Sequence, residues 1–322
     1  MQKQKILLLE AIHPVAKELL EKEGFIVRLE KKAFSEEELL KELAGIDALG
    51  IRSKTNVTEK VLKANPQLKV VGAFCIGTNQ IDLKSAKDLG ITVFNAPHSN
   101  TRSVAELVLG EIIMLSRKVM DKSRQAHQGG WDKAATGCFE VRGKTLGIVG
   151  YGNIGGQVSV LAEALGMKVI FFDIQKKLAI GNAKAKMSLL DVLIEANFVS
   201  LHVPDTKLTQ NMIQLDQLKM MKKGSYLINA SRGGVVDIKA LSESLKSGHL
   251  AGAAIDVFPY EPASNTEVFK TELQNLENVI LTPHIGGSTE EAQEAIGVEV
   301  AKSFIAFLKN GRKDGEILID NQ

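Results

Sequence analysis

The glycine-rich segment Gly150-Tyr-Gly-Asn-Ile-Gly155 lies near the middle of this 322-residue chain and restricts its fold more than any other feature. An apolar run, 146–149, leads directly into it, and a helical stretch, 156–165, follows. A second apolar run, 168–172, ends at Asp173, 18 residues after the last glycine. This order predicts a strand, a tight turn, a helix and a second strand. In such a unit the helix N-terminus binds the pyrophosphate of a dinucleotide.

The acidic residue at the end of the second strand indicates which dinucleotide is bound. Asp173 can accept hydrogen bonds from the adenosine ribose hydroxyls, whereas a 2′-phosphate there would meet its negative charge. The sequence therefore predicts NAD rather than NADP as the cofactor. Lys176 and Lys177 follow closely and could offset part of this repulsion, so residual use of NADP stays open.

Charge and apolar runs exclude several classes of partner. The chain has 40 basic and 38 acidic side chains, a net charge of +2, so no strong field favours nucleic acid or a membrane surface. The first apolar run is too short for a signal peptide, and no run approaches the ~20 residues of a membrane-spanning helix. The two cysteines, Cys75 and Cys138, have no metal-ligand spacing. We expect a cytoplasmic protein that binds a small-molecule substrate and no metal.

Strand and helix patterns alternate through the first hundred residues. Ser35, followed by three glutamates, predicts the N-cap and first turn of one helix. Five short apolar runs are separated by helical stretches, at 5–9, 25–29, 48–51, 69–73 and 91–94. This alternation is typical of a doubly wound parallel sheet. The segment has no glycine fingerprint of its own.

A long apolar segment, Thr101 to Met120, is expected to form one helix. Its apolar residues cover more than one face, which suits a domain boundary or a subunit interface. The single tryptophan, Trp131, lies in the glycine-containing stretch beyond this helix. We expect it to be part of a local core, with an interface anchor as the alternative.

Polar residues that can catalyse a reaction follow three of the later apolar runs. They are Arg232, Glu261 and His284. Ligands of an open parallel sheet bind beyond the carboxyl ends of its strands, so these side chains could meet in one crevice. Taken singly, they could be a surface charge, a solvated loop acid and a core histidine. Taken together and after the glycine motif, they predict an active site.

These three side chains fit the oxidation of a 2-hydroxy acid, in which a hydroxyl proton leaves as hydride departs from carbon. His284 is the natural general base, because the ordinary pKa of histidine is about 6.5. Glu261, bonded to the second ring nitrogen, would fix the tautomer and stabilise the imidazolium. Arg232 offers a fork of N–H donors to the substrate carboxylate and can polarise the developing carbonyl.

Motifs along the chain resemble those of a known family. Three segments are similar to signatures of the D-isomer-specific 2-hydroxyacid dehydrogenases: Asn229-Ala-Ser-Arg-Gly-Gly-Val-Val-Asp237, Ala253-Ala-Ile-Asp-Val-Phe258 with Glu261-Pro262, and Thr282-Pro-His-Ile-Gly-Gly-Ser288. Three further segments resemble the branch of this family that acts on 3-phosphoglycerate: 50–55, 74–82 and 94–106. The resemblance covers essentially the whole chain.

The family resemblance implies an α/β fold with two doubly wound parallel-sheet domains, Rossmann-like and flavodoxin-like. Residues 1–99 and 287–322 would form the substrate domain, and residues 100–286 the inserted NAD-binding domain. Hinges near Ser99 and Gly286 would bring Arg52 toward Arg232 and His284. A homodimer would form through the NAD-binding domains.

Individual roles are also implied by the resemblance. The catalytic set would be Arg232, Glu261 and His284. Cofactor contacts are expected at Gly150, Gly152, Asn153, Ile154, Gly155, Asp173, His202, Pro204, Ala230, Ser231, Asp256, Gly286 and Gly287. Substrate contacts are expected at Arg52, Ser53, Ile76, Gly77, Asn100 and Arg232. The guanidinium of Arg52 would face the substrate phosphate, because an arginine fork suits a dianion.

The implied reaction is the NAD-dependent oxidation of 3-phospho-D-glycerate to 3-phosphohydroxypyruvate, the first step of phosphorylated L-serine biosynthesis. Reduction of other 2-oxo acids, such as glyoxylate, hydroxypyruvate or 2-oxoglutarate, would use the same three residues. A formate dehydrogenase is disfavoured, because that relative has glutamine where Glu261 stands. A non-catalytic NAD-sensing protein, like the transcriptional corepressors of this superfamily, can keep all three, so these residues alone do not exclude it.

Related enzymes often carry a C-terminal regulatory domain that binds serine. This chain stops at Gln322, soon after its last predicted helix. We therefore do not expect serine feedback or tetramer formation that depends on such a domain, whereas the dimer is expected to form.

Overall fold

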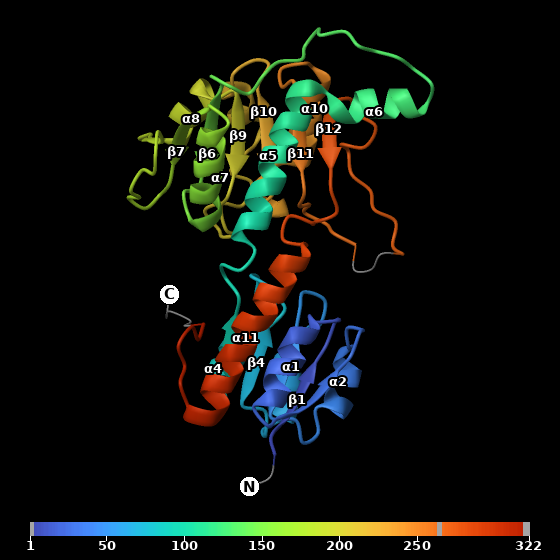
Figure 1. Ribbon diagram of the computed structural model, residues 1–322, viewed down its shortest axis with the longest axis vertical. Helices are drawn as coiled ribbons and strands as arrows, with labels where there is room; N and C mark the ends of the chain where they lie inside the picture. The colour runs from blue at the N-terminus through green and yellow to red at the C-terminus, as the bar shows by residue number, and fades with distance from the viewer. Residues whose placement is uncertain (1–2, 263–265, 318–322) are drawn as a thin grey trace. The chain divides into compact units, whose positions relative to one another are not determined.

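A computed structural model describes residues 3–262 and 266–317 of the chain. They belong to two compact units (Figure 1): residues 1–100 with 289–322, and residues 101–288. The chain leaves the first unit once and returns to it with its last helix. Each unit contains one parallel sheet, and this confirms the predicted α/β class with two doubly wound sheets.

The first unit has a five-stranded sheet in the order β2-β1-β3-β4-β5. Its strands are β1 (Lys5–Leu8), β2 (Ile26–Leu29), β3 (Ala48–Ile51), β4 (Val70–Ala73) and β5 (Thr92–Asn95). The chain moves outward from β1 to β2 and then returns to the other side of β1 with β3. The carboxyl ends of β1 and β3 therefore form a switch point, where such sheets bind ligands.

Helices cover both faces of this sheet (Figure 1), and they are α1 (Pro14–Lys22), α2 (Glu36–Glu42), α3 (Glu59–Ala64), α4 (Leu83–Asp88) and α11 (Glu290–Asn310). The predicted cap at Ser35 is confirmed, since its hydroxyl accepts from the backbone N–H of Glu38 at 3.2 Å. One face is buried under α1 and α11, where Phe74 and Phe304 pack edge to face with ring centroids 6.1 Å apart. The apolar side chains of α2, α3 and α4 bury the other.

The second unit has a seven-stranded parallel sheet in the order β12-β11-β10-β9-β6-β7-β8. Its strands are β6 (Thr145–Val149), β7 (Lys168–Phe172), β8 (Lys184–Ala185), β9 (Phe198–Leu201), β10 (Tyr226–Asn229), β11 (Gly252–Ile255) and β12 (Val279–Leu281). Here β6 and β9 are neighbours, and the chain continues outward from them in opposite directions. The switch point of this sheet thus lies beyond the ends of β6 and β9.

Two groups of helices enclose this second sheet. One face is buried under α5 (Thr101–Arg117) and α7 (Asn153–Ala164). The other is buried under α8 (Leu189–Glu195), α9 (Leu215–Met220) and α10 (Ile238–Lys246), and a short 3-10 helix, η1 (Gly233–Val235), follows β10. We did not predict β8 or α8. Ser188 and Asp191 form a reciprocal capping box at the start of α8, a signal that was present in the sequence.

The helix expected from Thr101 to Met120 is two helices, which corrects the prediction. It stops at Arg117, and α6 (Val119–His127) begins after Lys118, whose φ of 53° is left-handed. Residues far along the chain satisfy the carbonyl groups at this break. The N–H of Phe139 donates to the carbonyl of Ser116 at 3.0 Å, and the thiol of Cys138 lies 3.4 Å from the carbonyl of Arg117.

Trp131 is also placed differently from the expectation of a local core. Its side chain is 87% exposed, and the other residues of the stretch 128–137 are exposed as well. The alternative, an interface anchor, fits this exposure.

Within residues 3–262 and 266–317, no helix combines the length and the apolar character that crossing a membrane requires.

Candidate active site

The glycine loop follows β6 and permits close backbone contacts. Gly150 has a φ of 90°, and a Cβ atom added to it would lie 2.3 Å from the carbonyl oxygen of His202. A Cβ atom added to Gly155 would lie 2.2 Å from the carbonyl oxygen of Gly150. Both positions therefore require glycine. Gly152 instead faces open space, since beyond its chain neighbours no atom of the described residues lies within 4 Å of an added Cβ.

This open space is suited to a pyrophosphate. Gly152 is the N-cap residue of α7 and has no side chain with which to cap the helix, so the backbone N–H groups of the first turn, at Asn153 and Ile154, point out of its end. The site lies at the switch point between β6 and β9. The helix dipole and the backbone N–H groups of the first turn favour an anion there, so the residues present fit a dinucleotide.

Asp173, directly after β7, is held beside the glycine loop. Its Oδ2 atom accepts a hydrogen bond from the N–H of Tyr151 at 2.8 Å, and its Oδ1 atom accepts from the N–H of Gln175 at 2.8 Å. A carboxylate can accept about four hydrogen bonds, so two lone-pair positions stay available for ribose hydroxyls.

His202 follows β9 and presents its backbone to Gly150. Its Nε2 atom lies 2.8 Å from the hydroxyl of Ser200, and burial lowers the pKa of His202 to about 4. The ring is therefore neutral at physiological pH and cannot repel or attract a ligand by charge. The carbonyl of Pro204 accepts a hydrogen bond from the hydroxyl of Thr209 at 2.6 Å, which shapes the loop beyond.

The turn that carries Arg232 is organised by the last residue of β10. Asn229 accepts from the backbone N–H and the hydroxyl of Ser231, at 3.1 and 2.8 Å, and donates to the carbonyl of Arg232 at 3.0 Å. Ala230 completes this turn. A Cβ atom on Gly233 would lie 2.0 Å from the backbone of Phe258, so this turn packs against the segment that leads to Glu261.

Asp256 organises the turn that carries His284. It is 1% exposed and follows β11. Its Oδ1 atom accepts from the hydroxyl of Thr282 at 2.6 Å and from the N–H of Ile285 at 2.8 Å, and its Oδ2 atom accepts from the N–H of Gly286 at 2.8 Å. These bonds hold His284 in a left-handed conformation, with a φ of 54°. Gly287 continues the same turn.

His284 and Glu261 are hydrogen-bonded to each other, with Nδ1 of the ring 2.8 Å from Oε2 of the carboxylate. This bond is the main reason that the pKa of His284 is raised, and it outweighs the opposing effect of burial. Burial alone would raise the pKa of Glu261, but His284 and the N–H of Phe258 lower it overall. The charge of Arg232 lowers the pKa of both residues, so the structure brings all three together.

A buried acid in α5 was missed at the level of sequence. Glu111 is 0% exposed, and within the described residues neither of its carboxyl oxygens has a hydrogen-bond partner. Burial, with a further contribution from the charge of Asp256, raises the pKa of Glu111 to about 8. It is therefore protonated at neutral pH. Its place in the apolar run Val108-Leu-Gly-Glu-Ile112 was the available signal.

The remaining predicted substrate residues belong to the first unit. Arg52 and Ser53 follow β3, and Ile76 and Gly77 follow β4. The carbonyl of Ile76 accepts a hydrogen bond from the side chain of Asn95 at 2.7 Å. The Oδ1 atom of Asn100 is buried and has no partner within the described residues.

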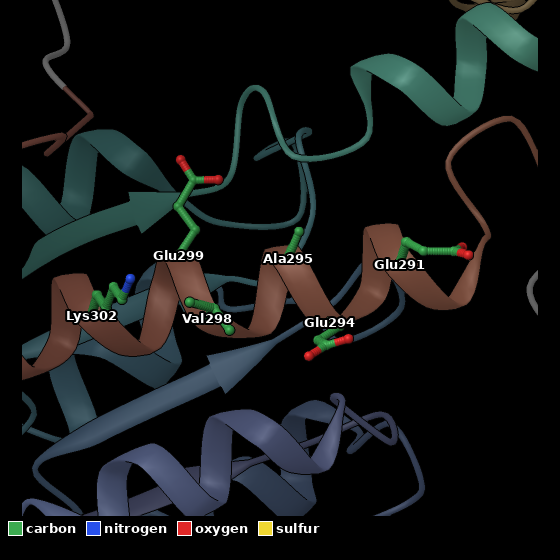
Figure 2. A pocket seen from close by; sticks show the side chains of 6 residues that line it. All are labelled: Glu291, Glu294, Ala295, Val298, Glu299 and Lys302. Carbon is green, nitrogen blue, oxygen red and sulfur yellow. The ribbon is translucent and has the colours of Figure 1, made fainter.

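A surface pocket elsewhere in the first unit has the wrong charge for an anionic substrate. Figure 2 shows that its lining side chains all come from α11, and they are Glu291, Glu294, Ala295, Val298, Glu299 and Lys302. Three carboxylates and one ammonium would repel a phosphorylated acid. Glu299 also accepts a hydrogen bond from the hydroxyl of Ser99.

Comparisons with known proteins agree with this geometry. Residues 109–286 match the family model for the D-isomer specific 2-hydroxyacid dehydrogenase, NAD binding domain. The D-3-phosphoglycerate dehydrogenase of Dictyostelium discoideum is 51% identical over 315 residues, which are 98% of this chain and 77% of that protein. The D-3-phosphoglycerate dehydrogenase of Escherichia coli is 53% identical over 310 residues, which are 96% and 76%.

Solved structures show the same architecture. The D-lactate dehydrogenase of Aquifex aeolicus, complexed with NAD and lactic acid, superposes with a TM-score of 0.83 at 28% identity. The alignment covers 98% of this chain and 100% of that one, so the similarity extends through both units.

Proposed function

The chain belongs to the D-isomer-specific 2-hydroxyacid dehydrogenases, and we propose that it oxidises 3-phospho-D-glycerate to 3-phosphohydroxypyruvate as the first step of phosphorylated L-serine biosynthesis. Its cofactor is NAD. The observation that carries the proposal is the hydrogen-bonded pair of His284 and Glu261 beside Arg232, in the unit that contains the glycine loop. Relatives with this activity match it along nearly the whole chain.

His284 is the general base in this proposal. Its Nδ1 atom is bonded to Glu261, so Nε2 is the nitrogen that accepts the hydroxyl proton of the substrate. NAD held at the glycine loop would supply the acceptor for the hydride from the carbon that carries this hydroxyl. The left-handed turn held by Asp256 aims the ring, and this costs conformational energy that the buried hydrogen bonds offset.

Glu261 stabilises the cation that forms when His284 takes the proton. Its carboxylate is fixed by the N–H of Phe258, which donates to Oε1 at 3.1 Å, while Oε2 remains on the imidazole. The ring therefore keeps one tautomer and one orientation through the reaction.

Arg232 is proposed to hold the substrate carboxylate and to polarise the carbonyl that develops. One guanidinium nitrogen, Nη1, donates to the carbonyl of Ser231 at 2.7 Å and fixes the side chain. The other N–H groups of the fork remain for two oxygen atoms of the substrate.

Arg52 is proposed to bind the phosphate, with Ser53, Ile76, Gly77 and Asn100 as further substrate contacts. Phosphate requires a cation with several donors, and the half-buried guanidinium of Arg52 supplies them at the switch point of the first sheet.

Steady-state kinetics test the base. His284→Ala should lower kcat by roughly 10²–10⁴-fold, the usual contribution of general acid–base catalysis, and leave NADH affinity close to that of the wild type. A kcat near the wild-type value would show that another group takes the proton.

A paired substrate assay tests the phosphate contact. Arg52→Ala should raise KM for phosphohydroxypyruvate much more than KM for hydroxypyruvate, which lacks only the phosphate. Equal increases for both compounds would remove the phosphate role of Arg52.

We also propose a homodimer formed through the NAD-binding units. All nine residues of α6 are described and none is buried, while apolar side chains are exposed on and beside this helix: Ile113, Val119, Met120 and Trp131. Figure 1 shows α6 and the following loop extending away from the sheet of their unit. Met120→Glu with Trp131→Glu should give a monomer in sedimentation velocity, and an unchanged dimer would place the interface elsewhere.

A cytoplasmic location is the last part of this proposal. Cys75 and Cys138 are both half-buried thiols that form no disulfide within the described residues, which suits a reducing compartment. Recovery of the active protein in the membrane or secreted fraction of its cells would contradict this location.

A further inference from the structure

The loop that carries Arg52 is attached to a carboxylate at the switch point of the first sheet. Glu10 follows β1, and Arg52 follows the adjacent strand β3. The Oε1 atom of Glu10 accepts from the backbone N–H groups of Arg52 at 3.1 Å and Thr55 at 2.9 Å, and its Oε2 atom accepts from the N–H of Lys54 at 3.0 Å. One side chain thus fixes three backbone positions of this loop.

A second side chain attaches the same loop to the neighbouring one. The Nε2 atom of Gln80 donates to the carbonyl of Arg52 at 2.6 Å and to the carbonyl of Gly77 at 3.2 Å. It also lies 3.4 Å from the sulfur of Cys75. The loops after β3 and β4, which hold the predicted substrate contacts Arg52, Ser53, Ile76 and Gly77, are therefore joined through one carboxamide.

These contacts leave the guanidinium available. The carboxylate of Glu10 is used by backbone N–H groups, and within the described residues the guanidinium of Arg52 makes one contact, of 3.5 Å, from Nη1 to the carbonyl of Glu10. In residues 3–262 and 266–317, no ion pair involves Arg52. The carboxylate of Glu10 therefore organises the backbone of the Arg52 loop and does not occupy the N–H donors of the guanidinium.

The backbone at Glu10 points to the same conclusion. Glu10 and Ala11 both have positive φ values, 61° and 50°, which side chains other than glycine adopt at a cost. Hydrogen bonds hold this turn, from the N–H of Glu10 to the carbonyl of Lys32 and from the N–H of Ala11 to the carbonyl of Glu30, each 3.1 Å long. Glu10 is 8% exposed, so the strained turn directs a carboxylate inward to the Arg52 loop.

We propose that Glu10 and Gln80 are positioning residues that hold the Arg52 loop in its phosphate-binding form and so set the preference for a phosphorylated substrate. This rests on the proposed function, in which Arg52 binds the phosphate. Neither residue belongs to the predicted catalytic set of Arg232, Glu261 and His284. Their loss should therefore change phosphate recognition and leave the chemical step largely intact.

The test is a double-mutant cycle read with phosphohydroxypyruvate and hydroxypyruvate as paired substrates. Glu10→Gln keeps the shape of the side chain but replaces one acceptor oxygen with an N–H donor that faces a backbone N–H. We expect at least a tenfold increase in KM for phosphohydroxypyruvate, less than a twofold change in kcat, and little change in KM for hydroxypyruvate. Gln80→Met, which removes the donor, should act in the same direction.

A glutamine in the same unit supplies the matched control. The Nε2 atom of Gln67 donates to the carbonyl of Leu43 at 2.8 Å and joins two loops that contain no predicted substrate residue. Gln67→Met should therefore leave the ratio of the two KM values at the wild-type level, with a change in Tm similar to that of Gln80→Met. A shifted ratio in this control would mean that any loosening of the unit disturbs phosphate binding, which would overturn the proposal.

The double variant Glu10→Gln with Arg52→Ala separates the possible failures. If Glu10 acts through Arg52, the ratio of KM for phosphohydroxypyruvate to KM for hydroxypyruvate should be the same in the double variant as in Arg52→Ala alone. Additive losses, or equal losses on both substrates, would overturn the positioning role while the proposed function stands. If Arg52→Ala itself does not discriminate, the phosphate role of Arg52 is wrong and the positioning role falls with it.

Discussion

The imidazole Nδ1 of His284 and the carboxylate Oε2 of Glu261 lie 2.8 Å apart, although the two residues come from different strand ends of one sheet. The pair links the protonation of the ring to the presence of the carboxylate. Because Glu261 favours the imidazolium, it raises the pKa of His284 above the ordinary value. Oxidation requires the neutral ring, so kcat/KM for the hydroxy acid should increase with pH through this raised pKa, and reduction should show the opposite trend.

Glu261→Gln should move this pH dependence. Without the carboxylate, the pKa of His284 falls and the rising limb of the oxidation profile shifts to lower pH. The limiting kcat should also fall, on the order of 10²-fold, because the imidazolium loses its partner. The measurement is kcat/KM against pH, with Glu243→Gln on the exposed side of α10 as the control. An unchanged pH profile would show that Glu261 does not set the pKa of the titrating group.

Alanine at the first two glycines of the fingerprint should have different effects. Gly150→Ala forces a Cβ atom against the carbonyl of His202 at a positive φ. It should lower the free energy of unfolding by about 1–3 kcal/mol, lower Tm and abolish NADH binding. Gly152→Ala faces open space and should keep the wild-type Tm, but raise Kd for NADH because the methyl group occupies the pyrophosphate position. Thermal unfolding and NADH fluorescence titration distinguish them, and equal Tm values would contradict this account.

Asp173→Asn should reduce the preference for NAD over NADP. Asparagine removes the negative charge that would repel a 2′-phosphate, so kcat/KM with NADP should rise relative to that with NAD. The N–H groups of Tyr151 and Gln175 bond to different oxygens of Asp173, so one of them would face the NH₂ group of asparagine, and Kd for NADH should also increase. A cofactor ratio equal to that of the wild type would mean that Asp173 does not set the selectivity.

Glu111 should make the free energy of unfolding depend on pH. Its pKa is about 8 in the native state and 4.5 in the unfolded chain, so the native state binds the additional proton between these values. The contribution of Glu111 to the free energy of unfolding is fully present below pH 4.5 and is lost as pH rises through 8. Between about pH 6 and pH 8, unfolding should become easier by on the order of 2–3 kcal/mol.

Glu111→Gln provides the check on this dependence. Glutamine has nearly the same shape and does not titrate, so the difference in unfolding free energy between variant and wild type should grow in favour of the variant as pH rises. Urea titrations at several pH values measure it. Parallel curves for the two proteins would show that the acid does not titrate in this range.

The sequence predicted the features that depend on neighbours in the chain. Both parallel sheets, the cap at Ser35 and the strand–turn–helix unit at Gly150 follow from local patterns. The end of α5 did not, because the left-handed Lys118 is stabilised by contacts from residues 138–139. Trp131 likewise lies in a stretch, 128–137, whose residues are all exposed, and a local pattern does not reveal this exposure.

Side chains that bond to backbone groups far away in the sequence could not be predicted from motifs either. Glu10 bonds to a loop more than forty positions away, and Gln80 reaches back to Arg52. Their partners become neighbours only because β1, β3 and β4 lie in one sheet. The pairing of His284 with Glu261 could be predicted, since both follow strand ends within a recognisable motif.

The return of α11 to the first sheet sets an order for folding during synthesis. The ribosome completes β1 to β5 early, but one face of their sheet is covered only when Ile296, Val300 and Phe304 arrive, after residues 101–288 have been made. Residues 101–288 are synthesised before α11, so the inserted unit can fold as soon as it has left the ribosome. The entropy of closing so long a connection increases only slowly with its length. The unit that contains the N-terminus is thus the last to finish folding, the reverse of the usual order for consecutive domains.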